Sequence, residues 1–280
     1  MKGAKKAVKR YEKISTTAWF TAEGRTFSDI PYSKEFFEAM KRVDAPSRLL
    51  SINHSSVSFC YIEARYKMIN TFLLESRIKQ ILELASGFSP RGFSMAADET
   101  ADYVEIDLPQ VIEKKRVVLS FMSQRLPKNL HLEHGNVLKL ADLKAACRHF
   151  DANRQIAVIH EGLLRYLTFD EKGIVAKNIA GLLRKFGGVW ITTDVTLSNF
   201  INKKNISGET RAITGIDITS NAFRDVDESK RFFESFGFSV DVHSLKELGD
   251  ALVSPSKLKL SRKEVKDTLE KGYLLVMRLA

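Results

Sequence analysis

Apolar residues recur along this chain with two different periods, and the period changes near residue 78. Upstream, segments such as Ser33 to Val43 and Ser58 to Ser76 place an apolar side chain every three or four positions, which is the period of an amphipathic helix. Downstream, short apolar or alternating runs are separated by helical segments. The pattern predicts an N-terminal helical cap over residues 1–78 and an α/β domain over residues 79–280.

Seven short runs in the second region are predicted as strands. Gln155 to His160 is apolar at nearly every position, as a strand covered on both faces should be. Tyr103 to Leu108 alternates and stops at Pro109, a residue that suits the first turn of a helix. The other predicted strands are Gln80 to Ala85, Leu130 to Val137, Val189 to Val195, Phe238 to Val242 and Tyr273 to Arg278.

Helices are predicted between these strands, at Gln110 to Gln124, at Asp227 to Phe236 and, as a longer helix, between Thr168 and Gly187. That longer helix begins at Thr168, three residues before Glu171, which is the spacing of a capping box. It ends before Gly187, where a left-handed cap belongs. Strands that alternate with helices predict a mostly parallel, Rossmann-like sheet with helices on both faces. Residues 196–226 are polar and break this alternation, which predicts an insertion or lid.

Composition places the chain among ordinary globular proteins, with 280 residues, 44% hydrophobic and 28% charged. The net charge of +10 comes partly from basic runs within the first thirteen residues and over residues 257–271. Both runs have roughly helical spacing, which favours solvated helix faces over a nucleic-acid surface. The chain has two distant cysteines and no apolar run of about 18 residues. We therefore expect a cytoplasmic protein with no disulfide, no metal site and no membrane span.

Candidate chemistry lies at the strand ends, because ligands of such sheets bind outside the carboxyl ends of the strands. The small residues Ala85, Ser86 and Gly87 follow the first strand and would let the backbone approach a ligand. Asp107 ends the second strand, 20 positions after Gly87, where a carboxylate can accept hydrogen bonds from ribose hydroxyls. The alternatives are a plain tight turn and a solvated carboxylate beside Lys114 and Lys115.

The third and fourth strand ends complete the pattern. Asn136 could accept a hydrogen bond from an adenine amine while the N–H of Val137 meets a ring nitrogen. His160 to Tyr166 follows the fourth strand, at the place where a methyl donor would meet its acceptor. No metal site is predicted at His131 and His134, because they lie on opposite faces of a strand.

Together these segments resemble the leucine carboxyl methyltransferase family, which includes polyketide-tailoring O-methyltransferases. The resemblance spans roughly residues 16–280, and the segments that carry it are residues 16–27, Arg65 in ARYKMIN, Leu84 to Arg91, YVEIDLPQVIEKKR at 103–116 and EGLLRYLT at 161–168. It implies a class I methyltransferase sheet with an antiparallel last strand, N-terminal helices and a lid insertion. It also implies S-adenosyl-L-methionine as cofactor.

The same resemblance implies roles for particular residues. Arg65 would pair with the carboxylate of the cofactor, Asp107 would hold its ribose, and Glu161 would lie near its methionine end. The whole cofactor-binding set implied is Arg65, Glu83, Ala85, Ser86, Gly87, Arg91, Asp107, Leu108, Asn136, Val137 and Glu161. The family usually has glycine at the position of Ala85 and aspartate at that of Ser89. These departures leave open an alternative, a cofactor-binding protein that transfers no methyl group and serves as a sensor or scaffold.

The acceptor decides which catalytic groups are needed. A carboxylate is already ionised at pH 7, whereas a phenol or alcohol needs a general base. The catalytic candidates are Tyr166, Arg165 and His160. Arg165 would hold a substrate carboxylate or would be a helix-surface arginine, and His160 would be a base or a buried histidine with its ring hydrogen-bonded. The expected acceptor is a carboxylate or hydroxyl of a small molecule or peptide terminus, and the sequence does not indicate the oligomeric state.

Overall fold

The computed structural model describes residues 15–43, 56–198, 201, 214–248 and 250–280. The basic run predicted within the first thirteen residues lies outside the described residues. So does much of the predicted insertion, at positions 199–200 and 202–213.

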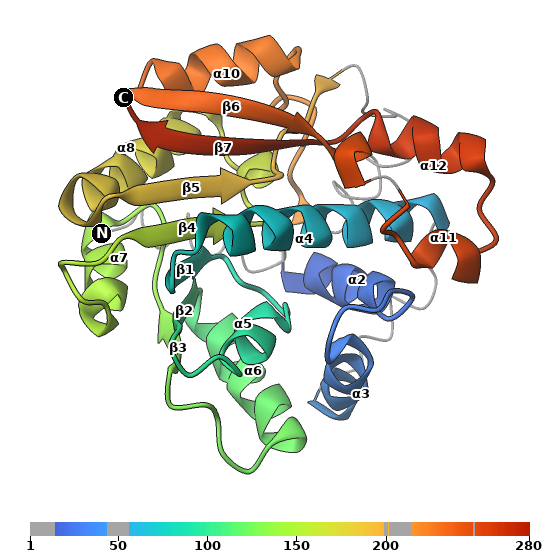
Figure 1. Cartoon of the computed structure of the whole chain (residues 1–280), viewed down its shortest axis with the longest axis horizontal. Helices are drawn as coiled ribbons and strands as arrows, with labels where there is room; N and C mark the ends of the chain where they lie inside the picture. Colours follow the sequence, from blue (N-terminus) through green and yellow to red (C-terminus); the bar gives the residue numbers. More distant parts are fainter. Residues whose placement is uncertain (1–14, 44–55, 199–200, 202–213, 249) are drawn as a thin grey trace.

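Seven strands form one sheet in the order β3-β2-β1-β4-β5-β7-β6. All neighbours pair in parallel except β7, which is antiparallel to both β5 and β6. In Figure 1 β5 and β6 point toward the side where α2 and α12 lie, and β7 points back. The predicted sheet and its antiparallel last strand are confirmed. The strands are β1 (Gln80–Leu84), β2 (Asp102–Asp107), β3 (Leu130–His134), β4 (Ile156–His160), β5 (Gly188–Thr192), β6 (Phe238–Ser244) and β7 (Tyr273–Leu279).

The helices begin and end where local sequence signals place them. Pro109 is the first residue of α6, and Thr168 caps α8 with both bonds of the predicted capping box to Glu171. Gly188 needs its missing side chain, because a Cβ there would lie 2.0 Å from the carbonyl oxygen of Ile156. The described helices are α2 (Ser15–Arg25), α3 (Ser33–Val43), α4 (Ser56–Ser76), α5 (Arg91–Met95), α6 (Pro109–Met122), α7 (Leu140–Ala146), α8 (Phe169–Phe186), α10 (Val226–Glu234), α11 (Ser254–Lys257) and α12 (Arg262–Leu269), with 3-10 turns η3 (Cys147–His149), η4 (Leu164–Tyr166) and η6 (Leu245–Leu248).

Apolar side chains form two core layers, one on each face of the sheet. Neighbouring residues of a strand enter different layers, as Ile81 and Leu82 of β1 do, because successive side chains of a strand point to opposite faces. Helices α3, α4, α6 and α12 contribute to the layer that contains Ile81, and α7, α8 and α10 to the layer that contains Leu82. All five residues of β4 are buried, which explains why this strand is apolar nearly throughout.

The N-terminal helices share one of these layers with the sheet. Met68 and Ile69 of α4 pack in the same cluster as Ile159 of β4 and Ile191 of β5. The division of the chain into a cap over residues 1–78 and a separate sheet domain therefore stays a prediction. Within the part of the chain that the structure describes, no helix is both long and apolar enough to cross a membrane.

Candidate functional site

The turn after β1 touches the end of β2, as the sequence pattern predicts. The backbone N–H of Gly87 donates to Asp107 Oδ2 at 2.7 Å, and the N–H of Leu108 donates to Asp107 Oδ1 at 2.7 Å. Burial raises the pKa of Asp107, and these two donors act against that rise. Each carboxylate oxygen keeps a second lone pair for another donor. The loop and the carboxylate therefore form a single polar surface.

Ala85 occupies a backbone conformation that favours glycine. Its φ is 49°, and that of Gly87 is 50°, so two residues of one turn are in the left-handed region. For a residue with a Cβ this region costs about 1–2 kcal/mol. The departure from the family's glycine thus leaves the turn formed, at a local cost in free energy.

Replacing Ala85 with glycine is expected to raise the free energy of unfolding by up to about 1.5 kcal/mol. The substitution removes the steric cost of the left-handed region, of about 1–2 kcal/mol. The greater freedom of glycine in the unfolded chain offsets about 0.4–1 kcal/mol of that gain. Urea denaturation measures the change. Ala96→Gly is the matched control, because Ala96 has φ −70° and should only lose stability. Equal losses at both positions would contradict the strain.

A buried ion pair lies under this turn. Lys115 of α6 pairs with Glu105 of β2, and both side chains are 1% exposed. Lys115 Nζ also lies 3.5 Å from Ser86 Oγ. Burial raises the pKa of Glu105, and the charge of Lys115 acts against that rise. Lys115 therefore supports the turn through Glu105 and Ser86.

A cluster of arginines surrounds Glu161 at the end of β4. Glu161 Oε1 accepts from Arg65 Nη2 at 3.0 Å and from Arg65 Nε at 3.3 Å, while Glu161 Oε2 accepts from Arg91 Nη2 at 2.7 Å. The Glu161 side chain is 5% exposed. Burial alone would raise the pKa of this carboxyl, but the neighbouring arginines, Arg91 foremost, lower it to about 2. Glu161 is therefore ionised at any ordinary pH.

Glu83 supports this cluster from inside the sheet. It is 1% exposed, accepts from Arg91 Nη1 at 2.6 Å and accepts from the hydroxyl of Tyr103 at 2.7 Å. Arg91 is fully buried, and its Nε donates to Asn70 Oδ1 at 2.8 Å. Glu83 and Arg91 thus hold one another and Glu161 in place, and a direct contact of either residue with a cofactor stays a prediction.

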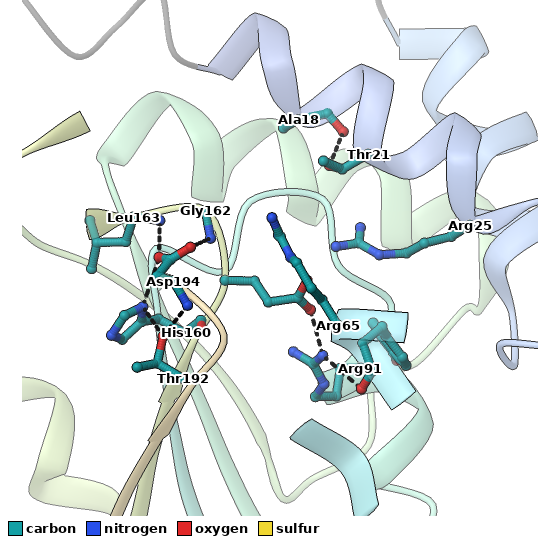
Figure 2. A network of polar contacts seen from close by, with 12 residues as sticks. Ala18, Thr21, Arg25, Arg65, Arg91, His160, Gly162, Leu163, Thr192 and Asp194 are labelled. Atoms are coloured by element: carbon teal, nitrogen blue, oxygen red, sulfur yellow. Dashed lines mark hydrogen bonds and ion pairs between the residues drawn. The ribbon is translucent and has the colours of Figure 1, made fainter. Parts of the chain in front are cut away.

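Asp194, which follows β5, organises the loop after β4, although it was not among the predicted site residues. Its carboxylate accepts from three successive backbone N–H groups. Those of Gly162 at 2.7 Å and Leu163 at 2.5 Å are seen in Figure 2, and the third is that of Leu164 at 3.0 Å. Burial would raise its pKa, but His160 and these donors hold it well below the usual range. A carboxylate just after a strand is the pattern that pointed to the other site residues. Asp194 did not show this pattern, because the predicted strand ran from Val189 to Val195, whereas β5 ends at Thr192.

His160 is buried beneath this loop. Its side chain is fully buried, Nδ1 lies 3.0 Å from Asp194 Oδ2 and 3.1 Å from Thr192 Oγ1, and its ring packs 5.7 Å from that of Trp190. Figure 2 shows His160, Thr192 and Asp194 gathered on the side away from Arg25 and Arg91. This placement favours the buried, hydrogen-bonded alternative over a base that contacts substrate.

Tyr166 and Arg165 belong to the loop after β4, at the place where it contacts α2 and residues 216–221. The Tyr166 hydroxyl is 3.1 Å from Thr17 Oγ1, and its ring packs with Ile216 and Ile218. The carbonyl of Arg165 accepts from Asn221 Nδ2 at 3.3 Å. Among the described residues, no group hydrogen-bonds the buried Nε of Arg165. Catalytic roles for both residues stay predictions.

Lys172 fastens the same segment to the loop, and sequence reasoning did not single it out. It is 1% exposed, and Nζ donates to the carbonyls of Leu167 and Asn221, each at 2.7 Å. Burial lowers its pKa to about 8. The later part of the predicted insertion is therefore packed against the motif after β4.

The end of β3 lies beside Asp107. The N–H of Gly135 donates to the carbonyl of Asp107 at 2.8 Å. Asn136 Oδ1 accepts from the N–H of Leu138 at 2.9 Å, which closes a local turn. The carbonyl of Val137 accepts from Asn178 Nδ2 at 3.0 Å. The structure thus brings the first three strand ends together, as predicted.

The strand order and the chemistry at the strand ends define the fold of a class I S-adenosylmethionine-dependent methyltransferase. Residues 33–180, more than half of the chain, match the leucine carboxyl methyltransferase family. The chain belongs to this family, and the resemblance read from its motifs is confirmed.

Individual proteins agree with this assignment. A protein of Mycolicibacterium gilvum (strain PYR-GCK), provisionally named an S-adenosyl-L-methionine-dependent methyltransferase, is 26% identical over 206 residues, which are 70% of this chain and 59% of that protein. The chain therefore spans less than two thirds of that relative's length. A DUF574 family protein from Streptomyces avermitilis MA-4680 shares the fold with TM-score 0.58 and 16% identity, over 89% of this chain and 91% of that one. The structure of PigF with S-adenosylhomocysteine has TM-score 0.50 and 14% identity, over 89% and 70%.

Proposed function

We propose that this chain transfers a methyl group from S-adenosylmethionine to an oxygen atom of a small molecule or peptide terminus. The observation that carries the proposal is the 2.7 Å contact between the N–H of Gly87 and the carboxylate of Asp107. A loop that admits a close ligand and a carboxylate that accepts hydroxyl donors lie at adjacent strand ends, which is the arrangement that holds a nucleoside. Membership of the family supports the same conclusion.

The residues present fit this cofactor. Asp107 has lone pairs left for ribose hydroxyls. Asn136 follows the neighbouring strand β3, and its Oδ1, which accepts from the N–H of Leu138, has a second lone pair for an adenine amine. The charged cluster at Glu161 suits a zwitterionic amino-acid group, because it offers both a carboxylate and guanidinium groups. The bound cofactor would supply a methyl group on a positively charged sulfur. The protein's own contribution is to align donor and acceptor, which supplies roughly 7–11 kcal/mol in well-oriented reactions.

A carboxylate is the acceptor that the described residues favour over a hydroxyl. A hydroxyl needs a base, and the acidic and basic groups of the β4 loop are already committed. Glu161 is held ionised by arginines, Asp194 by backbone donors, and His160 is fully buried. A carboxylate needs no proton removed at pH 7. Arg165, with its unpartnered Nε, is the group that we propose to hold it.

We propose that the segments around the sheet select the acceptor. Residues 1–78 would act as a cap and residues 196–226 as a lid, and Tyr166 would lie between them. The contact of Tyr166 with Thr17 on one side and with Ile216 and Ile218 on the other supports this role.

Asp107→Ala is expected to weaken binding of S-adenosylhomocysteine by about 1–3 kcal/mol, because two ribose hydroxyls lose their acceptor. Isothermal titration calorimetry measures the affinity. Asp241→Ala is the matched control, because Asp241 lies on β6, away from β2, is 61% exposed and pairs with Arg278 of β7. Unchanged affinity in Asp107→Ala would show that the second strand end does not hold the ribose.

Transfer itself is tested with methyl-labelled S-adenosylmethionine and matched sets of carboxylic acids, phenols and alcohols. We expect product from a carboxylic acid, recognised because a methyl ester releases methanol in alkali and a methyl ether does not. Label in alkali-stable products only would overturn the carboxylate preference. No binding of the cofactor at millimolar concentration would overturn the whole proposal.

A further inference from the structure

Thr193, the residue directly after β5, carries a buried hydroxyl that makes no hydrogen bond. The residue is 2% exposed, and no group in the described part of the chain lies in hydrogen-bonding position to its Oγ1. A buried hydroxyl without a partner costs free energy. Valine would fill the same space without that cost, so the hydroxyl points to a ligand that accepts from it.

The Thr193 side chain points to the face of the sheet that α4 covers. The residues on either side of it, Thr192 and Asp194, both turn toward the ring of His160 on the other face (Figure 2). Successive side chains of a strand alternate between the two faces. Thr193 therefore points the same way as Ile191, which packs in the core layer to which α4 contributes.

Tyr61 of α4 crosses the end of β5 on this face. A Cβ added to Gly272, the residue before β7, would lie 2.8 Å from Tyr61 Cε2, so the ring packs against the start of that strand. The guanidinium of Arg65, which pairs with Glu161 after β4, lies 5.5 Å from the ring centre of Tyr61. Because β5 lies between β4 and β7 and is antiparallel to β7, Tyr61 spans the part of the sheet edge where Thr193 lies.

The charged groups near Tyr61 leave donors, and not acceptors, available. Burial raises the pKa of Tyr61, and the charges that act on its hydroxyl are those of Arg65, Arg165, Asp194 and Glu161. Both carboxylates already accept several hydrogen bonds, Glu161 from arginines and Asp194 from backbone N–H groups. Arg165 keeps a buried Nε to which no described residue is hydrogen-bonded. Two hydroxyls and one guanidinium are therefore gathered at the end of β5.

These donors lie beside the proposed cofactor site. Asp107, Gly87 and Glu161 follow β2, β1 and β4, and β5 is the next strand in the sheet. Ligands of such sheets bind outside the carboxyl ends of the strands. A second ligand at the end of β5 would therefore adjoin the end of the cofactor that lies at β4.

We propose that the hydroxyls of Tyr61 and Thr193 bind the carboxylate of the acceptor together with Arg165. This inference rests on the proposed function and names two further residues that select its substrate. The acceptor oxygen forms the new O–C bond while the S–C bond breaks and its electron pair stays on sulfur, so no proton has to leave. Since the carboxylate loses its negative charge in this step, the donors bind it most strongly before transfer, and their loss raises KM more than it lowers kcat.

Thermal unfolding without any ligand tests whether the Thr193 hydroxyl lacks a partner. Thr193→Val keeps the shape of the side chain and removes the hydroxyl, so we expect the melting temperature to rise by about 2–4 °C. Thr193→Ser keeps the hydroxyl and should give no rise. A melting temperature of Thr193→Val that stays the same or falls would overturn the inference, because the hydroxyl would then be satisfied in the free protein.

Transfer kinetics test what the two hydroxyls bind, with the carboxylic acid that gives the most labelled methyl ester as probe. We expect Thr193→Val and Tyr61→Phe each to raise KM for this acid roughly 10-fold, as the loss of a hydrogen bond to a charged group does. The value of kcat should change less than about twofold, and the affinity for S-adenosylhomocysteine should stay the same. Tyr32→Phe is the matched control, because Tyr32 is 42% exposed, and should alter none of these values.

The other outcomes separate this inference from the proposed function. An unchanged KM in either variant overturns the inference and leaves the proposed function standing. Weaker binding of S-adenosylhomocysteine also overturns it, because the hydroxyls would then serve the cofactor, and so does transfer by the wild type to phenols or alcohols only. A wild type that does not bind S-adenosylhomocysteine overturns the proposed function itself. If Tyr61→Phe does not fold, Thr193→Val decides alone.

Discussion

Arg91→Met is expected to lower the free energy of unfolding by about 3–5 kcal/mol, the cost of removing one partner from a buried charge network. Arg91 is fully buried and donates to Glu83 at 2.6 Å, to Glu161 at 2.7 Å and to Asn70 at 2.8 Å. Without the guanidinium, the Glu83 carboxylate keeps the hydroxyl of Tyr103 and loses its ion pair. Methionine restores much of the volume, so the loss reports charge and hydrogen bonding more than an empty cavity.

Equilibrium urea denaturation at pH 7 measures this loss. Lys79→Met is the matched control, because Lys79 pairs with Asp98 at 2.7 Å while both side chains are about 45% exposed. Exposed pairs contribute about 0–1 kcal/mol, so the control should change little. A loss at Arg91 no greater than that at Lys79 would mean that the cluster does not stabilise the fold.

The second large effect is a dependence of stability on acid pH that comes from Glu161. Its pKa is lowered from 4.5 in the reference state to about 2 in the folded protein. A lowered folded-state pKa means that this stabilisation is complete above pH 4.5 and is lost as the pH falls toward 2. Between pH 6 and pH 3 we expect Glu161 to account for a loss of about 2 kcal/mol in the free energy of unfolding.

Urea denaturation of wild type and Glu161→Gln at the two pH values isolates this contribution. Glutamine cannot ionise, so the variant is expected to be less stable at pH 6 and to lose about 2 kcal/mol less than wild type on going to pH 3. Glu113→Gln serves as control, because Glu113 is 65% exposed and lies 3.9 Å from Arg116. Parallel pH curves for wild type and Glu161→Gln would refute the lowered pKa.

Local signals in the sequence were enough for the elements and for part of the site. The capping box at Thr168 and the proline that opens α6 act within one turn of chain, so their outcome does not depend on distant residues. The alternating or continuous apolar residues of the strands likewise indicate which of their faces are buried. Gly87 and Asp107 were predicted to serve one ligand because ligands of such sheets bind outside the carboxyl ends of the strands, and the N–H of Gly87 contacts the Asp107 carboxylate.

Residues that act through distant partners could not be assigned in this way. His160 stands at a strand end, but only the packing of β5 beside β4 places Asp194 and Trp190 against its ring. Arg25 lies in a segment that was recognised by its similarity to the family, yet nothing local shows that its guanidinium is buried and acts on Glu161 from α2. The charged groups near this guanidinium are brought there by the fold, and the residues next to Arg25 in the sequence do not indicate them.

The sequence by itself determined the sheet, its helices and the set of strand-end residues, because periodicity, capping and strand-end position are properties of neighbouring residues. The tertiary structure alone decided which charged groups neutralise one another, because Glu161, Arg65, Arg91 and Arg25 come from four separate regions of the chain. Electrostatic energy depends on distance and burial and not on separation along the chain. Which charged residues of the site pair with one another could therefore be determined only from the folded structure.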